Sequence, residues 1–498
     1  MNSKIALALF AALALAGYAL AQPANNAPAY GPPVQLGEPA PARPNPAPAT
    51  TAPSPAPGTA VVPPAAELPA NARPSNQLMP VTAPVAQGVP SYLIRGGTVH
   101  TMGAQGVMQG TDVLISGGKI VAIGPGLTPP QGAQVIEANG RPVTPGLMAS
   151  FTQLGILEID LERTTNDTTA DGEIATAAFD VTDALNPNST LIPVTRVGGV
   201  TRAVVAPQPG SKVFTGQAAV IQLGLDPAML VKPRVGMFVQ LDPIGGGDGG
   251  KAMDRPTIWA TFRETITDAR DYLAKQAQYR APGGSRDQRS VRIDLEALGP
   301  VLRGEEPIVA IVNRASDIRQ LLAFARQQNL KVIIAGGGEA WMVANELAQA
   351  QVPVLIDAYD NLPGSFATLG ATLANAARLD KAGVKVAFLP PSDAPSHNAR
   401  RMGQIAGNAV ANGMDYEHAL AAITRVPAEI WGIADTYGTL DVGKDADVVL
   451  WDGDPLQVTT AATAVFIKGQ RIPMETRQTK LRDRYRDLNR KDMPFGYR

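Results

Sequence analysis

The feature that most constrains the fold is a long alternation of strand-like and helix-like runs between residues 141 and 432. Apolar β-type runs recur along it, and stretches with apolar residues at helical spacing, such as the one from Ile318, separate several of them. A repeated strand–helix order predicts a parallel sheet covered by helices. The stretch 147–432 is close to the roughly 250 residues typical of a (β/α)8 barrel. We therefore predict an α/β chain with a TIM-like barrel, and a doubly wound open sheet is the alternative. The strand-like runs are 143–151, 201–206, 219–223, 307–312, 331–335, 352–356 and 384–389, and the helix-like runs are 318–328, 340–350, 367–382 and 401–412.

Short β-type runs stand on both sides of this stretch. Before it, four runs between residues 92 and 137 are separated by turn residues, including two Gly-Gly pairs that are typical of hairpins. After it, two runs return at 448–451 and 464–467. Neither group has enough strands to be stable alone. We therefore predict that 91–146 and 433–475 together form one composite small β-sandwich domain.

The first 90 residues do not resemble part of a fold. Residues 1–21 contain one Lys, an apolar run and an Ala-Leu-Ala end, which together are typical of a cleaved secretory signal. A membrane anchor is the weaker alternative, because the apolar run is shorter than the roughly 20 residues of a span. Residues 22–90 hold 19 of the chain's 44 prolines, which predicts a disordered tether. The chain is therefore expected to be periplasmic or secreted, with membrane contact only through the signal peptide before cleavage.

Composition excludes several functions. The chain has no cysteine, so disulfides, thiolate metal sites and Cys nucleophiles are excluded, and its three histidines cannot supply a four-histidine cluster. Lys and Arg number 43 against 44 Asp and Glu, a net charge of −1 that argues against nucleic-acid binding. The tail 476–498 is basic, and a solvated helix explains it better than a nucleic-acid arm.

Four local sequences carry a resemblance to a known family. They are Asp112-Val-Leu-Ile-Ser-Gly-Gly-Lys-Ile-Val-Ala-Ile-Gly, Thr144-Pro-Gly-Leu, Thr424-Arg-Val-Pro-Ala-Glu-Ile-Trp-Gly and Gly438-Thr-Leu-Asp-Val-Gly-Lys-Asp-Ala-Asp-Val-Val-Leu. In this order and at this separation, they resemble the amidohydrolase superfamily, closest to its imidazolonepropionase-like branch. The resemblance implies a metal-dependent barrel that hydrolyses non-peptide carbon–nitrogen bonds.

The same resemblance implies one or two divalent metals, held by His, Lys and Asp side chains at strand ends. Only one of these ligands persists here, the Asp after the last strand, which is Asp393. The other expected ligand positions read Phe151, Gln153, Gln222, Ile311 or Asn313, and Gly336. Catalytic zinc usually keeps three protein ligands. We therefore predict that the metal centre is degenerate and that no cofactor is bound.

The remaining candidates follow the rule that barrel chemistry sits at the carboxyl ends of the strands. The predicted catalytic residues are Glu339, Asp393 and His397, and the predicted ligand-binding residues are Gln153, Arg314 and Asn398. A structural ion pair of Arg314 with Asp317 or Glu339 is the plainer alternative.

Three hypotheses for the function follow from these residues. One is a pseudoenzyme that binds a small-molecule ligand in the barrel mouth or an envelope protein partner. The second is a hydrolase with a remodelled site built from Glu339, Asp393 and His397, and the third is a structural role through the tether. Homo-oligomer formation is left open. His100 and His418 are expected to be ordinary surface residues.

Two further segments could each be a ligand-binding loop or an ordinary solvated loop. The acidic loop with Asp160, Glu162, Asp167, Asp171 and Glu173 could bind calcium, but a solvated loop is favoured.

The segment Gly245–Lys251 has the glycine and lysine spacing of a phosphate-binding loop. However, Ala252 replaces the required Ser or Thr, and Pro256 interrupts the expected helix. A flexible Gly-rich loop is therefore favoured for this segment.

Overall fold

The computed structural model describes residues 90–170, 176–244, 253–280, 290–359, 361–392 and 394–486. The predicted signal peptide and all but the last residue of the predicted tether lie outside these residues. So do the Gly-rich segment 245–252, the acids Asp171 and Glu173, and the predicted catalytic residue Asp393.

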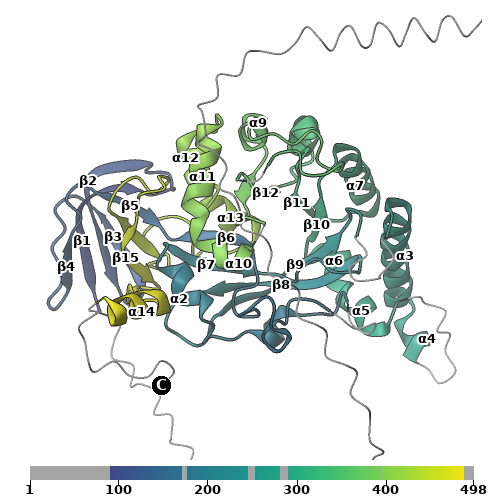
Figure 1. Cartoon of the computed structure of the whole chain (residues 1–498), viewed down its shortest axis with the longest axis horizontal. Coiled ribbons are helices and arrows are strands. Elements are labelled where there is room, and N and C mark those ends of the chain that lie inside the picture. The colour runs from purple at the N-terminus through teal and green to yellow at the C-terminus, as the bar shows by residue number, and fades with distance from the viewer. Residues whose placement is uncertain are drawn as a thin grey trace, which may run out of the picture. The chain divides into compact units, whose positions relative to one another are not determined.

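Eight strands form one sheet in the order β13-β12-β11-β10-β9-β8-β7-β6 (Figure 1). All neighbours in this sheet are parallel except β8, which runs antiparallel to both β7 and β9. The strands are β6 Leu147–Thr152, β7 Val200–Val205, β8 Phe214–Gln222, β9 Leu230–Gln240, β10 Ile308–Val312, β11 Val332–Gly336, β12 Val354–Ile356 and β13 Val386–Phe388.

A short segment closes this sheet into a barrel. The backbone N–H of Met148 on β6 donates to Ile423 O at 2.8 Å, and the N–H of Phe388 on β13 donates to Ala422 O at 3.2 Å. Residues 422–423 therefore bridge the two end strands. The predicted α/β barrel is confirmed, and the alternative of an open doubly wound sheet is wrong.

Helices cover the outer face of the barrel (Figure 1). The longest in the described residues is α3 from Arg255 to Ala274, so the expectation that Pro256 interrupts a helix is wrong. Pro256 instead occupies the first turn, where its missing N–H is not needed, and Asp254 caps the helix by accepting from Thr257 N at 2.9 Å.

The predicted helix 367–382 is shorter than expected, because only its second half is helical as α9. The other α-helices are α2 Leu191–Arg196, α4 Gln276–Arg280, α5 Arg292–Ala297, α6 Gly299–Leu302, α7 Ala315–Gln328, α8 Ala344–Gln349, α9 Asn375–Lys381, α10 Pro395–Asn398, α11 Met402–Ala411, α12 Tyr416–Ala421 and α13 Arg425–Ile430. The 3-10 helices are η1 Arg163–Thr165, η2 Val181–Ala184, η3 Ala340–Val343 and η4 Ala399–Arg401.

A second sheet contains strands from before and after the barrel, as predicted. Its order is β16-β15-β14-β5-β1-β2-β3, with β4 also paired to β1. Antiparallel pairing of β5 with β14, for example Val143 opposite Leu450, joins the two segments. The sheet curls enough for Tyr92 on β1 to meet Phe466 on β15, with ring centroids 4.9 Å apart. Its strands are β1 Tyr92–His100, β2 Val107–Ser116, β3 Lys119–Gly124, β4 Gln134–Glu137, β5 Pro142–Pro145, β14 Val448–Trp451, β15 Ala462–Ile467 and β16 Gln470–Arg471.

A buried ion cluster ties this β domain to the barrel. Arg202 on β7 donates to both carboxylate oxygens of Asp447, at 2.8 and 3.1 Å, and to Asp445 at 3.1 Å. The Arg202 and Asp447 side chains are each 1% exposed. The ring of Tyr437 packs against the guanidinium at 5.3 Å. Nothing in the sequence patterns predicted this cluster.

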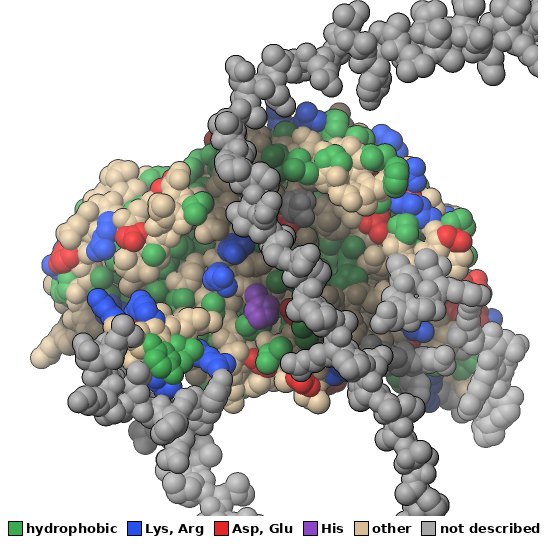
Figure 2. Space-filling view, viewed as in Figure 1, with side chains coloured by type: hydrophobic (Ala, Val, Ile, Leu, Met, Phe, Trp, Pro, Cys, Tyr) green, Lys and Arg blue, Asp and Glu red, His purple; other side chains and the backbone are tan. Residues whose placement is uncertain are grey.

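The described part of the tail contains one helix, α14 from Arg477 to Tyr485, which buries none of its residues and begins with a capping box at Thr476. This agrees with the expected solvated helix. In the described ranges, no helix is long and apolar enough to cross a membrane. Basic and acidic side chains are scattered over the face seen in Figure 2.

Candidate functional site at the carboxyl ends of the barrel strands

The carboxyl ends of the parallel strands meet at one end of the barrel, called here the mouth. Six polar residues follow these strands: Gln153 after β6, Gln240 and Asp242 at and after the end of β9, Asn313 after β10, Glu339 after β11, and Asp357 after β12. This is the face where barrel enzymes hold their chemistry, so it is the candidate functional site.

Apolar side chains fill the barrel interior at positions where the resemblance implies metal ligands. Phe151 and Ile311 pack against one buried hydrophobic cluster that contains Phe238 and Ala335. The Phe151 and Phe238 rings lie 5.3 Å apart. Neither Phe nor Ile has a lone pair to offer a metal.

The histidine position of the family at the end of β11 is occupied by Gly336, which leaves little room for a side chain. Gly336 has a φ of 92°, which favours glycine. A Cβ there would lie 2.8 Å from Asn313 Oδ1. A histidine therefore does not fit at this position in the present arrangement.

Asp242 and Asn313 form a hydrogen-bonded pair that the sequence patterns did not predict. Asn313 donates its side-chain amide to Asp242 at 2.6 Å and its backbone N–H at 3.3 Å. Burial raises the pKa of Asp242, against the opposing effect of these hydrogen bonds. Asn313 Oδ1 also accepts from Gly338 N at 3.0 Å, so the pair connects the ends of β9, β10 and β11. The signal in the sequence is the position of Asp242 directly after the mainly apolar stretch Val235–Leu241.

Glu339 holds two backbone segments in place. Its carboxylate accepts from Ala315 N, at the first residue of α7, and from Gly370 N, each at 3.0 Å. Both oxygens therefore have a backbone donor. The described contacts do not join Glu339 to His397 or to Arg314.

Gln153 is buried and bound to α10. Its backbone N–H donates to Ser396 Oγ at 2.7 Å, and Ser396 Oγ donates to Gln153 Oε1 at 3.2 Å. The Gln153 Nε2 atom is buried without a hydrogen-bond partner among the described residues. This amide is an unused donor at the candidate site.

The predicted catalytic residue His397 and the predicted ligand-binding residues Asn398 and Arg314 lie at different depths. His397 on α10 is 40% exposed, with Nε2 3.8 Å from Asp160 Oδ2, whereas its neighbour Asn398 is buried. Arg314 is exposed at the start of α7. Its expected ion pair is wrong, because Asp317 instead pairs with Arg255 at 2.7 Å.

The tentative lysine position at Gln222 is also wrong. Because β8 runs antiparallel, its last residue pairs with Arg202 near the start of β7, at the opposite end of the barrel from the mouth. The Gln222 side chain accepts from Gly224 N at 2.7 Å and donates to two carbonyls in the turn to β9. The strand that ends at the mouth is β9, where Gln240 Oε1 is buried without a described partner.

In the described residues, no group of three or more His, Cys, Asp and Glu side chains could hold a metal ion. In the acidic loop, Glu162 is used to cap η1, accepting from Thr164 N at 3.2 Å.

The two remaining histidines differ from each other. His100 is not a surface residue as expected, because it is 9% exposed and bonds Glu417 at 3.1 Å. His418 is exposed, and its hydrogen bond to Asp380 raises its pKa.

Comparisons with known proteins agree with this architecture. A solved amidohydrolase from Thermotoga maritima is 24% identical and has a TM-score of 0.67, with 77% of this chain and 99% of that chain covered. That likeness shows the fold. The barrel and its flanking sheet therefore define the class as an α/β TIM-barrel fold with a separate β domain.

Sequence comparisons also find similarity to amidohydrolases. A model of the amidohydrolase family matches residues 341–473. The amidohydrolase tasK of Hapsidospora irregularis is 24% identical over 388 residues, which is 72% of this chain and 39% of tasK. An imidazolonepropionase from a Polaromonas species is 34% identical over 116 residues, which is 22% of this chain and 26% of that protein. These matches span less than half the length of either relative. The family model and both relatives support the amidohydrolase superfamily for this chain.

Proposed function

We propose that this is an exported member of the superfamily whose barrel mouth binds a small polar ligand and no longer holds the family's hydrolytic metal centre. The observation that carries the proposal is the chemistry of the aligned ligand positions. Phe151 and Ile311 belong to the apolar interior, and Gly336 has no room for a side chain. These residues do not fit a divalent metal, because such a site needs lone-pair donors.

The buried polar atoms of the mouth indicate the kind of ligand. Gln153 Nε2 is a donor and Gln240 Oε1 an acceptor, and both are buried without partners among the described residues. Unsatisfied buried groups of this kind each cost about 1–3 kcal/mol. A neutral molecule with both a donor and an acceptor, such as a cyclic amide, matches them.

The alternative hydrolase built from Glu339, Asp393 and His397 has less support. Both Glu339 oxygens accept backbone hydrogen bonds, which lowers their availability for proton transfer. His397 is 3.8 Å from Asp160 and has no described contact with Glu339. Asp393 lies outside the described residues.

The test combines binding with turnover. Untagged protein is titrated with lactams, hydantoins and imidazolones, and its melting temperature and the amount of each compound are followed together. We expect a concentration-dependent rise in melting temperature without loss of compound. Gln153→Leu should remove the rise, while the exposed control His418→Gln should keep it. Hydrolysis that is abolished in Asp393→Ala would contradict the proposal and favour the alternative.

A further inference from the structure

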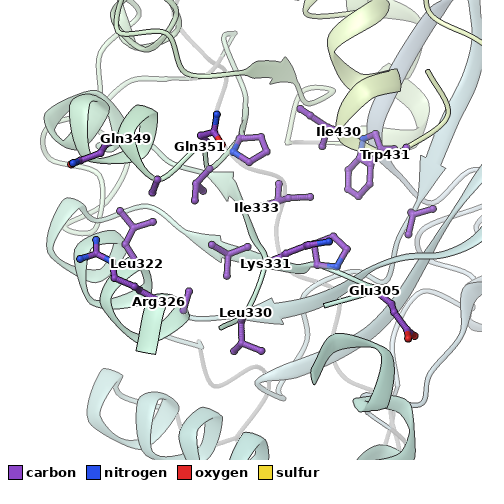
Figure 3. Close-up of a pocket in the computed structure, with 18 of the residues that line it drawn as sticks. Glu305, Leu322, Arg326, Leu330, Lys331, Ile333, Gln349, Gln351, Ile430 and Trp431 are labelled. Atoms are coloured by element: carbon purple, nitrogen blue, oxygen red, sulfur yellow. The ribbon is translucent and has the colours of Figure 1, made fainter. Parts of the chain in front are cut away.

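A hollow of about 1140 Å³ lies at the opposite end of the barrel from the mouth (Figure 3). Its lining residues come from the amino-terminal ends of four neighbouring parallel strands, β9 to β12, and from the helices α7, α8 and α13 with the residues directly after them. The hollow is therefore separate from the site proposed above. Its volume is slightly larger than the roughly 300–1,000 Å³ typical of small-molecule sites.

The walls of the hollow are apolar in the middle. Figure 3 shows Leu322, Leu330, Ile333, Ile430 and Trp431 around it. Trp431 is 1% exposed and belongs to the core that fills the barrel interior. A ligand placed here would meet a rigid, preformed apolar surface.

The residues that line the hollow carry more positive than negative charges. Five of them are basic and two, Glu305 and Glu346, are acidic. Glu346 is paired with Arg319 at 3.0 Å, and Glu305 with Arg303 outside the lining at 2.8 Å. The acidic side chains are therefore already neutralised.

The basic residues of the lining differ in whether a carboxylate pairs with them. Arg234 is paired with Asp180 at 3.2 Å. The ammonium of Lys232 donates to the carbonyl oxygens of Trp431 and Gly432, each at 3.1 Å, which leaves its charge in place. Arg326 and Lys331 have no ion pair or side-chain hydrogen bond in the described part of the chain.

A neighbouring carboxyl does not cancel this charge. Glu306 stands in the chain between two lining residues and is 2% exposed. Burial raises the pKa of Glu306 to about 8, so it is mostly neutral at pH 7.

We propose that this hollow is a binding site for a small organic anion with an apolar body, such as an aromatic or fatty carboxylate or sulfonate, with Arg326 and Lys331 as its charge partners. The apolar wall accepts the body of the ligand, and the two cations accept its head group. This inference does not rest on the function proposed for the mouth.

The test uses two fluorescent probes that differ mainly in charge. Anilinonaphthalene sulfonate is an anion, and N-phenyl-1-naphthylamine is its uncharged counterpart. Arg326→Gln/Lys331→Gln should weaken binding of the anion by about tenfold or more, and binding of the neutral probe should stay unchanged. Ala323→Trp, an exposed lining position on α7, should weaken binding of both probes by filling the hollow.

Two controls make the result specific. Arg477→Gln/Lys480→Gln removes the same charge from the exposed helix α14 and should leave both affinities unchanged. Melting temperatures of all variants show whether they are folded. The proposal is overturned if the anion does not bind the wild type, if Ala323→Trp binds it normally, or if the Arg326/Lys331 variant loses both probes equally or neither.

Discussion

One buried guanidinium, that of Arg202, connects residues that are far apart in the sequence. It joins β7 of the barrel to Asp447 and Asp445 just before β14. Removing one partner of a buried ion pair typically costs about 3–5 kcal/mol, because a charge is left uncompensated. Arg202→Met should lower the free energy of unfolding in urea by this amount. Arg319→Met, which breaks the exposed pair with Glu346, should cost about 0–1 kcal/mol. Equal losses in the two variants would contradict the importance of burial.

The buried carboxyl group of Glu306 should make the free energy of unfolding depend on pH. Both of its carboxylate oxygens are buried without described partners, and burial raises its pKa from 4.5 to about 8. Between these values the folded chain keeps a proton that the unfolded chain has lost. Its free energy of unfolding should therefore fall by up to roughly 1.4 kcal/mol per pH unit as pH rises, and then level off. Glu306→Gln should remove this slope, whereas parallel curves for the two proteins would show that Glu306 is ionised in the folded state.

Single residues also show how far the sequence could predict the candidate site. The Thr144-Pro-Gly-Leu motif, which leads into β6, located Phe151 and Gln153, because only a few residues separate them from it. Gln222 was misplaced, since the pattern of a buried strand does not reveal its direction. The pair of Asp242 and Asn313 depends on which strands are neighbours in the sheet, and this is a tertiary fact.

At the scale of elements, the antiparallel strand β8 is the main departure from a regular (β/α)8 order. The connections on its two sides, 206–213 and 223–229, are shorter than the dozen or so residues of a parallel crossover. Such short connections permit only antiparallel neighbours, so the direction of β8 could have been predicted from the lengths of the two connections. The bridge that residues 422–423 form between β6 and β13 could not have been predicted in this way, because no local sequence pattern marks it.

The β domain depends on its returning strands. Deleting residues from Gly438 onward removes β14, β15 and β16, exposes the edge of β5 and leaves Arg202 without its partners. The truncated chain should aggregate on expression. Its solubility is compared with that of a chain ending at residue 475, which keeps all sheet strands and should stay soluble. A soluble, cooperatively unfolding truncation at 438 would show that the first segment folds without the second.

At the scale of the whole molecule, export is a prediction from residues 1–21 alone. Expression of the full chain in a bacterium, followed by cell fractionation and intact-mass measurement, should give a periplasmic or secreted protein that begins at Gln22. Proteolysis of that protein should then remove residues up to about Ser91, because the Pro-rich segment buries too little apolar surface to fold. A cytoplasmic protein that retains residues 1–21 would contradict the prediction of export.

The proposed loss of the hydrolytic metal centre can be measured directly as the metal content of the purified protein. Untagged protein, expressed with and without added zinc and manganese, is dialysed and its metal content measured by elemental analysis. Because Phe151 and Ile311 lie in the apolar interior and Gly336 leaves little room for a side chain, we expect well under one equivalent of any transition metal. A chelator should also leave the melting temperature unchanged. One tightly bound equivalent of metal that is lost in Asp393→Ala would show instead that the barrel keeps a metal centre.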